Sequence, residues 1–251
     1  MAKRADSVVG IDLGKHVLKG VALRRKGDSR FILTSFASRP VPEEFASAED
    51  LSRELKQLLR ELGGGAKACA FAVSDPSTIL RIIEQPDTPV DLLRNALRLN
   101  GLAVLNQECK DFVLDVAPVG GHANDESTAE TSSTAGTKAA VKSAVVTQTK
   151  YLVGGMLRSQ VKQIVAAANK NRLSAEILQL APVCSFNAFE FAYPEIFAND
   201  AFLLLDMGHL QSTVLIGSKR ELVLVRSIDY GGKALMHALT PKTRSMPMRP
   251  G

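Results

Sequence analysis

The feature that most constrains the fold of this chain is an internal repeat. Near its start the chain reads VVGIDLGKHVLKGVALRRKGDSRFILTSF, and near residue 200 it reads AFLLLDMGHLQSTVLIGSKRELVLVRSI. Both stretches run as an apolar strand, an Asp-x-Gly turn, a second strand, a charged turn and a third strand. A chemical feature at the same place in two copies is a stronger signal than either copy alone. We therefore expect two similar units of three antiparallel strands.

Hydrophobic periodicity between the two copies predicts alternating helices and strands. Ser47 is placed to cap a helix whose leucines recur at helical spacing, and Gly63-Gly64-Gly65 is expected to end it. Further helices are expected over 89–99, 156–171 and 182–191. Strands are expected over 68–74, 78–83, 112–119, 143–149 and 175–180. This alternation is typical of the α/β class.

Composition excludes several classes of protein. With 45% hydrophobic and 23% charged residues, the chain is globular rather than disordered or fibrous. No uninterrupted apolar run approaches the length of a membrane-spanning helix, and the N-terminus lacks the apolar core of a secretion signal. Cys69, Cys109 and Cys184 lie far apart without a CxxC pair, which indicates buried thiols in a reducing compartment. We expect a cytoplasmic protein that does not insert into a membrane.

The net charge of +5 is unevenly distributed along the chain. Residues 1–30 carry eight basic and three acidic side chains, and residues 219–251 carry seven and two. The stretch 31–218 carries 16 basic and 21 acidic side chains. The basic ends lack interleaved aromatic residues, since the chain has no Trp and only three Tyr. A nucleic-acid partner is therefore not expected.

The two Asp-x-Gly turns have a specific chemical use. A carboxylate at the end of a buried strand, Asp12 or Asp206, can orient a water molecule bound to Mg²⁺, which keeps much of its hydration shell. The glycine that follows, Gly14 or Gly208, lets backbone N–H groups approach a phosphate without a Cβ in the way. Two such turns facing each other would hold the phosphates of a nucleotide from both sides. The alternative is a pair of ordinary hairpin turns, in which Asp and Gly are common.

The residues around both turns resemble those of a known superfamily. GIDLG at 10–14 with VLK at 17–19, and LDMG at 205–208 with ST at 212–213, are similar to the two phosphate loops of the actin, heat-shock-chaperone and sugar-kinase superfamily. Within that superfamily the chain resembles the PilM family of type IV pilus assembly proteins, which are relatives of the cell-division protein FtsA. Further stretches that carry the resemblance lie at 83–97, 178–190 and 226–235. The similarity runs in order over about residues 7–240.

The resemblance implies an actin-like (ribonuclease H-like) α/β fold. It also implies an inserted small α+β subdomain and an incomplete second half. The implied division is residues 1–77 plus 156–196 for the first actin-like subdomain, 78–155 for the inserted subdomain with a mobile loop at 120–140, 197–240 for a partial second actin-like subdomain, and 241–251 for a disordered tail.

The resemblance further implies a function. Proteins of this family are cytoplasmic, bind ATP and Mg²⁺ in the cleft between their halves, and hold the N-terminal cytoplasmic tail of an inner-membrane partner, PilN. The implied role is a scaffold of a type IV pilus or related secretion platform, peripheral to the inner membrane through that partner and able to self-associate. The implied nucleotide contacts are Asp12, Gly14, Lys15, His16, Asp206, Gly208, Gln211, Ser212, Gly231 and Gly232, with Asp12 and Asp206 reaching the metal through its bound water.

Departures from the family pattern leave alternatives open. Lys15 and His16 stand where small hydroxyl residues are usual, so the lysine can contact a phosphate as a point charge, or both side chains can fill the pocket instead. The glycine-rich segment that packs on adenine in the family has no counterpart, so a weak or a lost ATPase is compatible with the sequence. A protein of the FtsA type would need a C-terminal membrane helix. A small-molecule kinase of the superfamily would need a carboxylate base, and neither feature is identified.

Overall fold

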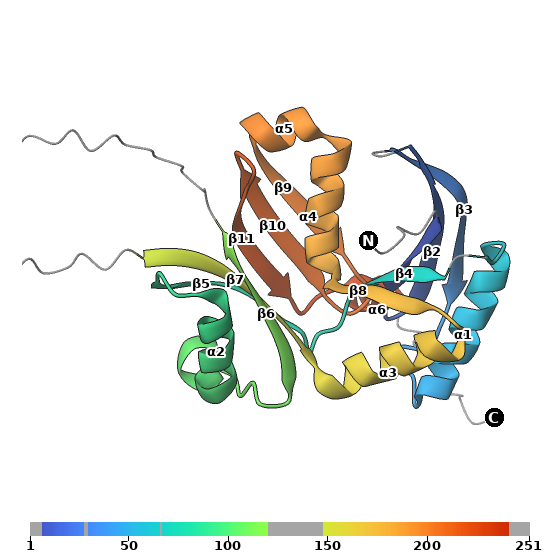
Figure 1. The fold of residues 1–251 in the computed structure, drawn as a ribbon, viewed down its shortest axis with the longest axis horizontal. Coiled ribbons are helices and arrows are strands. Elements are labelled where there is room, and N and C mark those ends of the chain that lie inside the picture. The colour runs from blue at the N-terminus through green and yellow to red at the C-terminus, as the bar shows by residue number, and fades with distance from the viewer. Residues whose placement is uncertain (1–6, 28–29, 66, 120–147, 241–251) are drawn as a thin grey trace, which may run out of the picture.

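The computed structural model describes residues 7–27, 30–65, 67–119 and 148–240. The expected loop at 120–140, residues 143–147 of an expected strand and the expected tail at 241–251 lie outside these ranges. The strands are β1 (Ser7–Leu13), β2 (Val17–Lys26), β3 (Arg30–Pro40), β4 (Ala68–Val73), β5 (Ile79–Pro86), β6 (Phe112–Val119), β7 (Gln148–Leu157), β8 (Ser174–Leu180), β9 (Ala201–Met207), β10 (Ser212–Ser218) and β11 (Glu221–Ile228). The helices are α1 (Ala48–Glu61), α2 (Val90–Leu105), α3 (Arg158–Lys170), α4 (Ala181–Ala192), α5 (Pro194–Asn199) and α6 (Gly232–Leu239). The described strands form three separate sheets (Figure 1).

The first sheet has five strands in the order β3-β2-β1-β4-β8. Strand β1 is antiparallel to β2 and parallel to β4, and β4 is parallel to β8. Helices α1 and α3 cover one face, where Ile11, Leu58 and Phe71 belong to one buried cluster (Figure 1). Because β1 and β4 are parallel and in register, Asp12 and the connection that follows Val73 lie at the same edge of the sheet.

Helix α1 forms where the sequence predicts it. The Asp50 N–H donates to the Ser47 hydroxyl at 3.2 Å, which caps the first turn of the helix. At the other end the Gly64 N–H donates to the Leu59 carbonyl at 3.1 Å. Gly63 and Gly64 both have positive φ, so the glycines end the helix as expected.

The second sheet, in the order β5-β7-β6, is inserted between β4 and α3 and packs against α2. Helix α2 is expected to end near Leu99 but continues to Leu105, with non-helical backbone at Asn100. Gly101 does not end the helix. A Cβ at this position would lie 2.5 Å from the sulfur of Cys109, so the glycine allows close packing instead.

Strand β7 differs most from the sequence expectation. A strand is predicted over 143–149, whereas the described strand continues to Leu157 and the next helix begins at Arg158. The strand is central and pairs with both β5 and β6, so Gly154-Gly155 lies inside a sheet rather than breaking a strand. A Cβ at Gly155 would lie 2.7 Å from the end of the Leu114 side chain and 3.2 Å from the Cβ of Ile79, so the glycine allows close packing of the sheet there.

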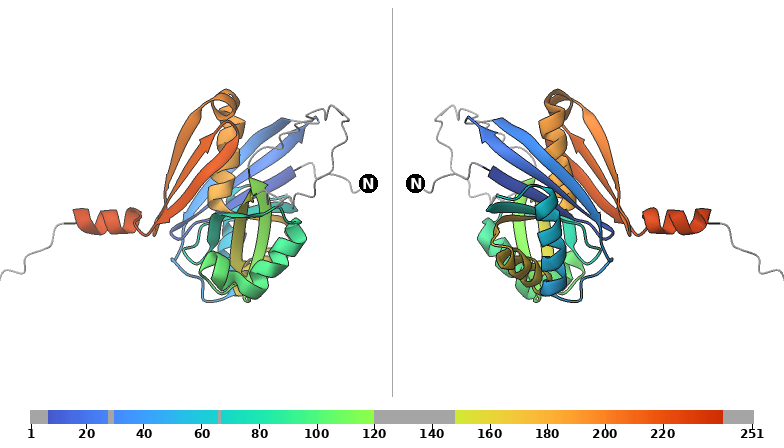
Figure 2. Two further views of the ribbon diagram at one scale, coloured as in Figure 1. Left: turned by 90° about the vertical axis from the view of Figure 1, so that its left-hand side faces the viewer. Right: turned by 90° about the vertical axis from the view of Figure 1, so that its right-hand side faces the viewer.

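The third sheet, in the order β11-β10-β9, is antiparallel and repeats the β3-β2-β1 arrangement. The repeat predicted from the sequence is therefore confirmed in the pairing of the strands. Helices α4 and α5 pack against this sheet through the rings of Phe186, Phe197 and Phe202. The short helix α5 is not predicted from the sequence. Helix α6 extends away from the rest of the protein and has no buried residue (Figure 2).

Candidate functional site

The two Asp-x-Gly turns lie on opposite walls of one cavity. Asp12 is the last residue but one of β1, and Asp206 is the last but one of β9. Both turns line a cavity of about 590 Å³, together with Cys184 of α4 and Gly232 of α6. The fold therefore brings the two copies of the repeated motif to a common site between the first and third sheets.

The glycines of the two turns occupy equivalent positions. A Cβ at Gly14 would lie 2.6 Å from the carbonyl oxygen of Val17, and a Cβ at Gly208 would lie 2.8 Å from the carbonyl oxygen of Gln211. In each case the obstructing atom is the backbone oxygen three residues later. Any side chain would force the turn open, so both turns need glycine for their shape.

Asp12 combines burial with an unused acceptor atom. The ammonium of Lys19 donates to its Oδ2 at 3.3 Å, whereas its Oδ1 is buried and has no hydrogen-bond partner among the described residues. Burial raises the pKa of Asp12 above its usual value, Lys19 lowers it, and the charge of Asp206 raises it. A buried oxygen without a donor, close to a second carboxylate, is a donor set that suits a hydrated Mg²⁺. The residues present therefore fit the expected metal.

Lys15 is held by a carboxylate beside the cavity. Its ammonium lies 2.5 Å from Oδ2 of Asp75, and the Ser77 hydroxyl donates to Oδ1 at 2.6 Å. The two ion-paired side chains are only 21% and 10% exposed. Burial opposes the charge of Asp75, but the hydrogen bonds from Lys15 and Ser77 outweigh it, so the pKa of Asp75 is lowered. A contact between Lys15 and a phosphate would have to compete with this ion pair.

We expect Asp75→Asn to lower the free energy of unfolding by about 1–3 kcal/mol at neutral pH, because it weakens charge-assisted hydrogen bonds. The folded-state pKa of Asp75 is lowered, so its contribution is present above the unfolded pKa of about 3.9 and is lost as the pH falls through the folded value. Urea unfolding of both proteins from neutral pH to acid should show the difference shrinking. Asp115→Asn, at an exposed carboxylate of β6, is the matched control. If the two proteins differed by the same free energy of unfolding at every pH, the lowered pKa assigned to Asp75 would be contradicted.

Two histidines close the space between the turns. The rings of His16 and His209 are stacked, with their centroids 4.4 Å apart and 14° between their planes. His209 Nε2 lies 3.4 Å from a carboxylate oxygen of Glu43, which also accepts a hydrogen bond from Lys233. The pKa of Glu43 is lowered, chiefly by that hydrogen bond from Lys233. These contacts join the first half to the second, so a ligand held by both turns would meet the histidine pair.

The double glycine before α6 shapes the second turn. The Gly232 N–H donates to the carbonyl of Gly208 at 2.8 Å, and the Lys233 N–H donates to that of His209 at 2.9 Å. A Cβ at Gly231 would lie 2.5 Å from the His209 carbonyl oxygen. Gly231 and Gly232 therefore hold the turn in place, which is a supporting role beside the one that the resemblance implies.

Ser212 and Gln211 differ in their surroundings. The Ser212 hydroxyl is buried and donates to the carbonyl of Tyr230 at 2.6 Å, so its proton is already used within the fold. Gln211 lines the cavity directly. Of these two expected contacts, Gln211 is therefore the better placed to meet a ligand.

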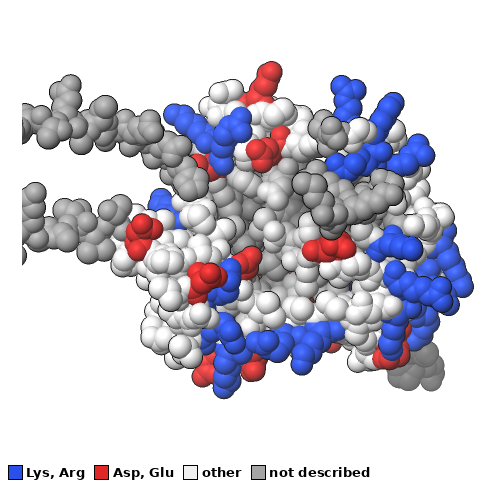
Figure 3. Space-filling view, viewed as in Figure 1, with Lys and Arg blue, Asp and Glu red and all other residues white. Residues whose placement is uncertain are grey.

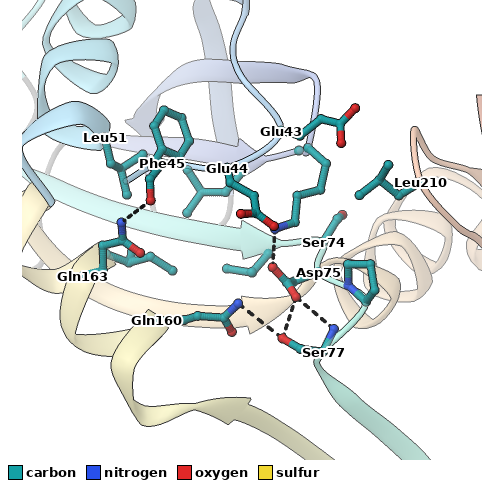
Figure 4. A pocket seen from close by; sticks show the side chains of 16 residues that line it. Glu43, Glu44, Phe45, Leu51, Ser74, Asp75, Ser77, Gln160, Gln163 and Leu210 are labelled. Atoms are coloured by element: carbon teal, nitrogen blue, oxygen red, sulfur yellow. Dashed lines mark hydrogen bonds and ion pairs between the residues drawn. The ribbon is translucent and has the colours of Figure 1, made fainter. Parts of the chain in front are cut away.

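A second cavity, of about 500 Å³, lies beside the first turn, where the chain enters and leaves the inserted sheet (Figure 4). Leu51 contributes to its apolar wall, and Glu43 and Glu44 line it on one side. Gln160 of α3 donates to the Ser77 hydroxyl at 3.3 Å, but its Oε1 is buried without a partner among the described residues. This cavity offers apolar surface, negative charge and a free acceptor. No sequence motif marks it.

Sequence comparisons find no counterpart for this chain: neither a protein-family model nor a curated protein matches it. Among solved structures, a chain of a "PilM-PilN type IV pilus biogenesis complex" has a TM-score of 0.74 and 22% identity, over 94% of this chain and 65% of that chain. A Bacteroides thetaiotaomicron protein with an actin-like ATPase fold and unknown function has a TM-score of 0.50 and 9% identity, over 90% and 71%. The cytoplasmic domain of EpsL, from the type II secretion system of Vibrio cholerae, has a TM-score of 0.49 and 12% identity, over 89% of this chain and 71% of that chain.

The likeness to these structures concerns the fold, because all identities are below 25%. The chain spans 65% of the length of the matched chain of the PilM-PilN complex. The fold that the resemblance of the two turns implies is therefore confirmed. The protein is an α/β protein with the actin-like ATPase fold, and its two repeated motifs line the cleft between the halves.

Proposed function

We propose that this protein is a cytoplasmic, PilM-like scaffold of a type IV pilus or related secretion platform. One observation carries the proposal: the fold matches a chain of a PilM-PilN complex over 94% of this chain, at a TM-score of 0.74. We place the protein at the inner membrane through a PilN-like partner. Among the described residues, no helix is both long and apolar enough to cross a bilayer.

The cleft is proposed to bind ATP with Mg²⁺. Asp12 and Asp206 would reach the metal through its bound water, since Oδ1 of Asp12 is buried without a partner. Gly14 and Gly208 would let the backbone of each turn approach the phosphates. The metal, when bound, supplies the positive charge that allows a triphosphate to lie beside two carboxylates.

Hydrolysis is proposed to be weak or lost. Among the described residues that line the cleft, the carboxylates are Asp12 and Asp206, and both are assigned to the metal. Lys15 of the first turn is paired with Asp75, and Lys19 is bonded to Asp12. A small-molecule kinase needs a further carboxylate to take the proton of its substrate hydroxyl. The cleft therefore favours a nucleotide-binding scaffold over a kinase.

The cavity shown in Figure 4 is the proposed site for the partner's tail. It lies at the junction between the first sheet and the inserted sheet, beside the connection from Asp75 to Ser77 and the start of α3. The unused Oε1 of Gln160 can accept a hydrogen bond from the backbone N–H of an extended peptide. Apolar side chains of the peptide would contact the wall that includes Leu51.

The charge of the cavity suits such a tail. Glu44 gives its rim a carboxylate, and Glu43 adds a second one that already accepts a hydrogen bond from Lys233. Cytoplasmic segments next to a membrane-spanning helix carry an excess of Lys and Arg. A basic tail would therefore be attracted to this rim, and salt would weaken the attraction.

The division into subdomains is part of the same proposal. The five-stranded sheet with α1 and α3 forms the core of the first actin-like unit, and the β5-β7-β6 sheet forms the inserted one. The β11-β10-β9 sheet forms the second actin-like unit. Self-association is proposed through the outer face of this last sheet, where Leu203, Leu205 and Met207 of β9 are exposed.

Titration of the protein with the N-terminal cytoplasmic tail of the PilN-like protein from the same genome tests the proposed function. We expect binding that weakens with salt, and we expect Gln160→Leu to weaken it about tenfold, since an unpaired peptide N–H costs about 1–3 kcal/mol. Gln148→Leu, on an exposed position of β7, removes the same amide and should leave the affinity unchanged. Failure of the wild-type protein to bind the tail at low salt would refute the partner assignment.

A further inference from the structure

A third cavity, of about 530 Å³, lies at the end of the first sheet that is remote from the two turns. Val9 of β1 lines it, whereas Asp12 lies near the opposite end of the same strand. Its apolar wall is formed by Val9, Ala22, Leu59, Leu62 and Leu173. The nucleotide and the partner tail proposed above leave this cavity unexplained.

Basic side chains line the same cavity. Lys56 and Arg60 come from α1, and Lys170 and Arg172 come from the end of α3 and the turn after it. Lys170 pairs with Glu49, whereas the other three form no ion pair within the described part of the chain. None of the lining residues is acidic. The cavity therefore combines an apolar wall with unneutralised positive charge.

The neighbouring hairpin extends this surface. Arg24 and Lys26 of β2 lie on the same side of the sheet as Ala22, because alternate residues of a strand share a face. On the adjacent strand β3, Ile32 is paired with Arg24 and is 37% exposed. In Figure 3, Lys and Arg side chains crowd the right-hand edge of the protein, where Figure 1 places β3 and α1.

We propose that this end of the protein binds the surface of an anionic membrane, with a phospholipid headgroup in the basic cavity. The phosphate would contact Lys56, Arg60 and Arg172, and the glycerol and upper acyl chain would contact the apolar wall. Ile32 would enter the interfacial region beside it. This proposal rests on the cavity and the neighbouring hairpin and does not depend on the proposed scaffold function.

A lipid surface fits these features better than a soluble anion or an acidic peptide. A soluble phosphate would use the cations but would leave the apolar wall and the exposed side chains of β3 without a partner. Basic residues interleaved with exposed apolar ones over a hairpin and a neighbouring cavity are typical of interfacial binding. Each Lys or Arg near an anionic surface contributes to such binding, so the effect of several is cumulative.

Co-sedimentation with vesicles tests the proposal. The protein should bind vesicles that contain about one third phosphatidylglycerol in phosphatidylcholine and should not bind pure phosphatidylcholine. Lys56→Glu combined with Arg60→Glu should weaken binding at least tenfold, since two attractive charges become repulsive. Arg98→Glu combined with Lys110→Glu makes the same change of net charge on the inserted unit, at exposed positions, and should weaken binding less than threefold.

A fluorescent reporter identifies the surface that contacts the lipid. The chain has no Trp, so Ile32→Trp on β3 and Leu102→Trp on α2 each give a single fluorophore at an exposed position. Anionic vesicles should shift the emission of the first to the blue and leave the second unchanged. Glycerol phosphate and a poly-glutamate peptide should produce neither shift.

Three results would overturn the proposal. They are equal binding to neutral vesicles, equal loss of binding in the two charge-reversal variants, and a blue shift at α2 but not at β3. Tight binding of poly-glutamate at this cavity without binding to vesicles would also overturn it, because it would assign the surface to an acidic peptide.

Discussion

Mg-ATP is expected to raise the melting temperature of the wild-type protein and to leave that of Asp12→Asn unchanged. A ligand that binds only the folded state stabilises it by about 2.7 kcal/mol when its concentration is 100 times its Kd. Asp12→Asn removes one of the two carboxylates proposed to hold the hydrated metal, and the neutral amide leaves the shape of the turn intact. The expected loss is therefore one of binding rather than of folding.

Without ligand, the same variant should melt at a higher temperature than the wild-type protein. Burial raises the folded-state pKa of Asp12, so folding disfavours its ionised form. The free energy of unfolding therefore falls as the pH rises from the unfolded-state pKa through the folded-state pKa. Scanning calorimetry at neutral pH, with and without millimolar Mg-ATP, measures both effects. Asp115→Asn, at an exposed carboxylate, should keep the wild-type response. A wild-type protein without any shift, or an Asp12→Asn variant with the full shift, would contradict the assigned nucleotide site.

Gly14→Ala and Gly208→Ala are each expected to lower the free energy of unfolding by about 1–3 kcal/mol. In both variants the new Cβ would stand less than 3 Å from a backbone carbonyl oxygen, and a backbone atom cannot rotate away as a side chain can. The two turns are equivalent in the internal repeat, so the two losses should be similar in size.

Gly154→Ala in β7 is the matched control. The nearest atom to its new Cβ, in Leu180, would be 3.6 Å away, which is an ordinary contact. Urea unfolding of the three variants should show two losses of similar size and a control within about 0.5 kcal/mol of the wild-type protein. If Gly14→Ala were as stable as Gly154→Ala, the tight geometry assigned to the turns would be incorrect.

The sequence predicts the repeated parts of this fold well, because they combine local signals. The strands around Asp12 and Asp206 alternate or run apolar, their turns contain Asp and Gly, and the second copy supports the first. The cap at Ser47 is predicted from Ser47 and from Asp50, which lies three residues later. Such features depend on residues close together in the chain, so a single sequence suffices for them.

The errors arise where tertiary packing overrides a local signal. The sequence predicts that the helix ends at Asn100-Gly101, but the structure has only a kink at Asn100, and Gly101 provides room for Cys109 in the connection to β6. The strand predicted over 143–149 continues to Leu157, because Gly154-Gly155 lies in a central strand that pairs on both sides. A glycine used for space cannot be distinguished from a glycine used for a turn until its neighbours are known.

Parts of the candidate site escape the sequence for a similar reason. Glu43 meets His209 and Lys233 only because the two halves come together, and no motif links these positions. Asp75 precedes the inserted sheet as an ordinary loop residue, yet it holds Lys15. Long-range ion pairs between single residues leave no periodic pattern. The fold is therefore more predictable than the exact use of each side chain.

The central claim is that the cavity between the first sheet and the inserted sheet receives the tail of a membrane partner. Hydrogen exchange of the protein with and without the N-terminal tail of the PilN-like protein measures this directly. We predict slower exchange in residues 74–78 and 158–164, which border the cavity, and unchanged exchange in α2. Unchanged exchange at the cavity under saturating tail, or protection confined to α2 or the β11-β10-β9 sheet, would contradict the claim.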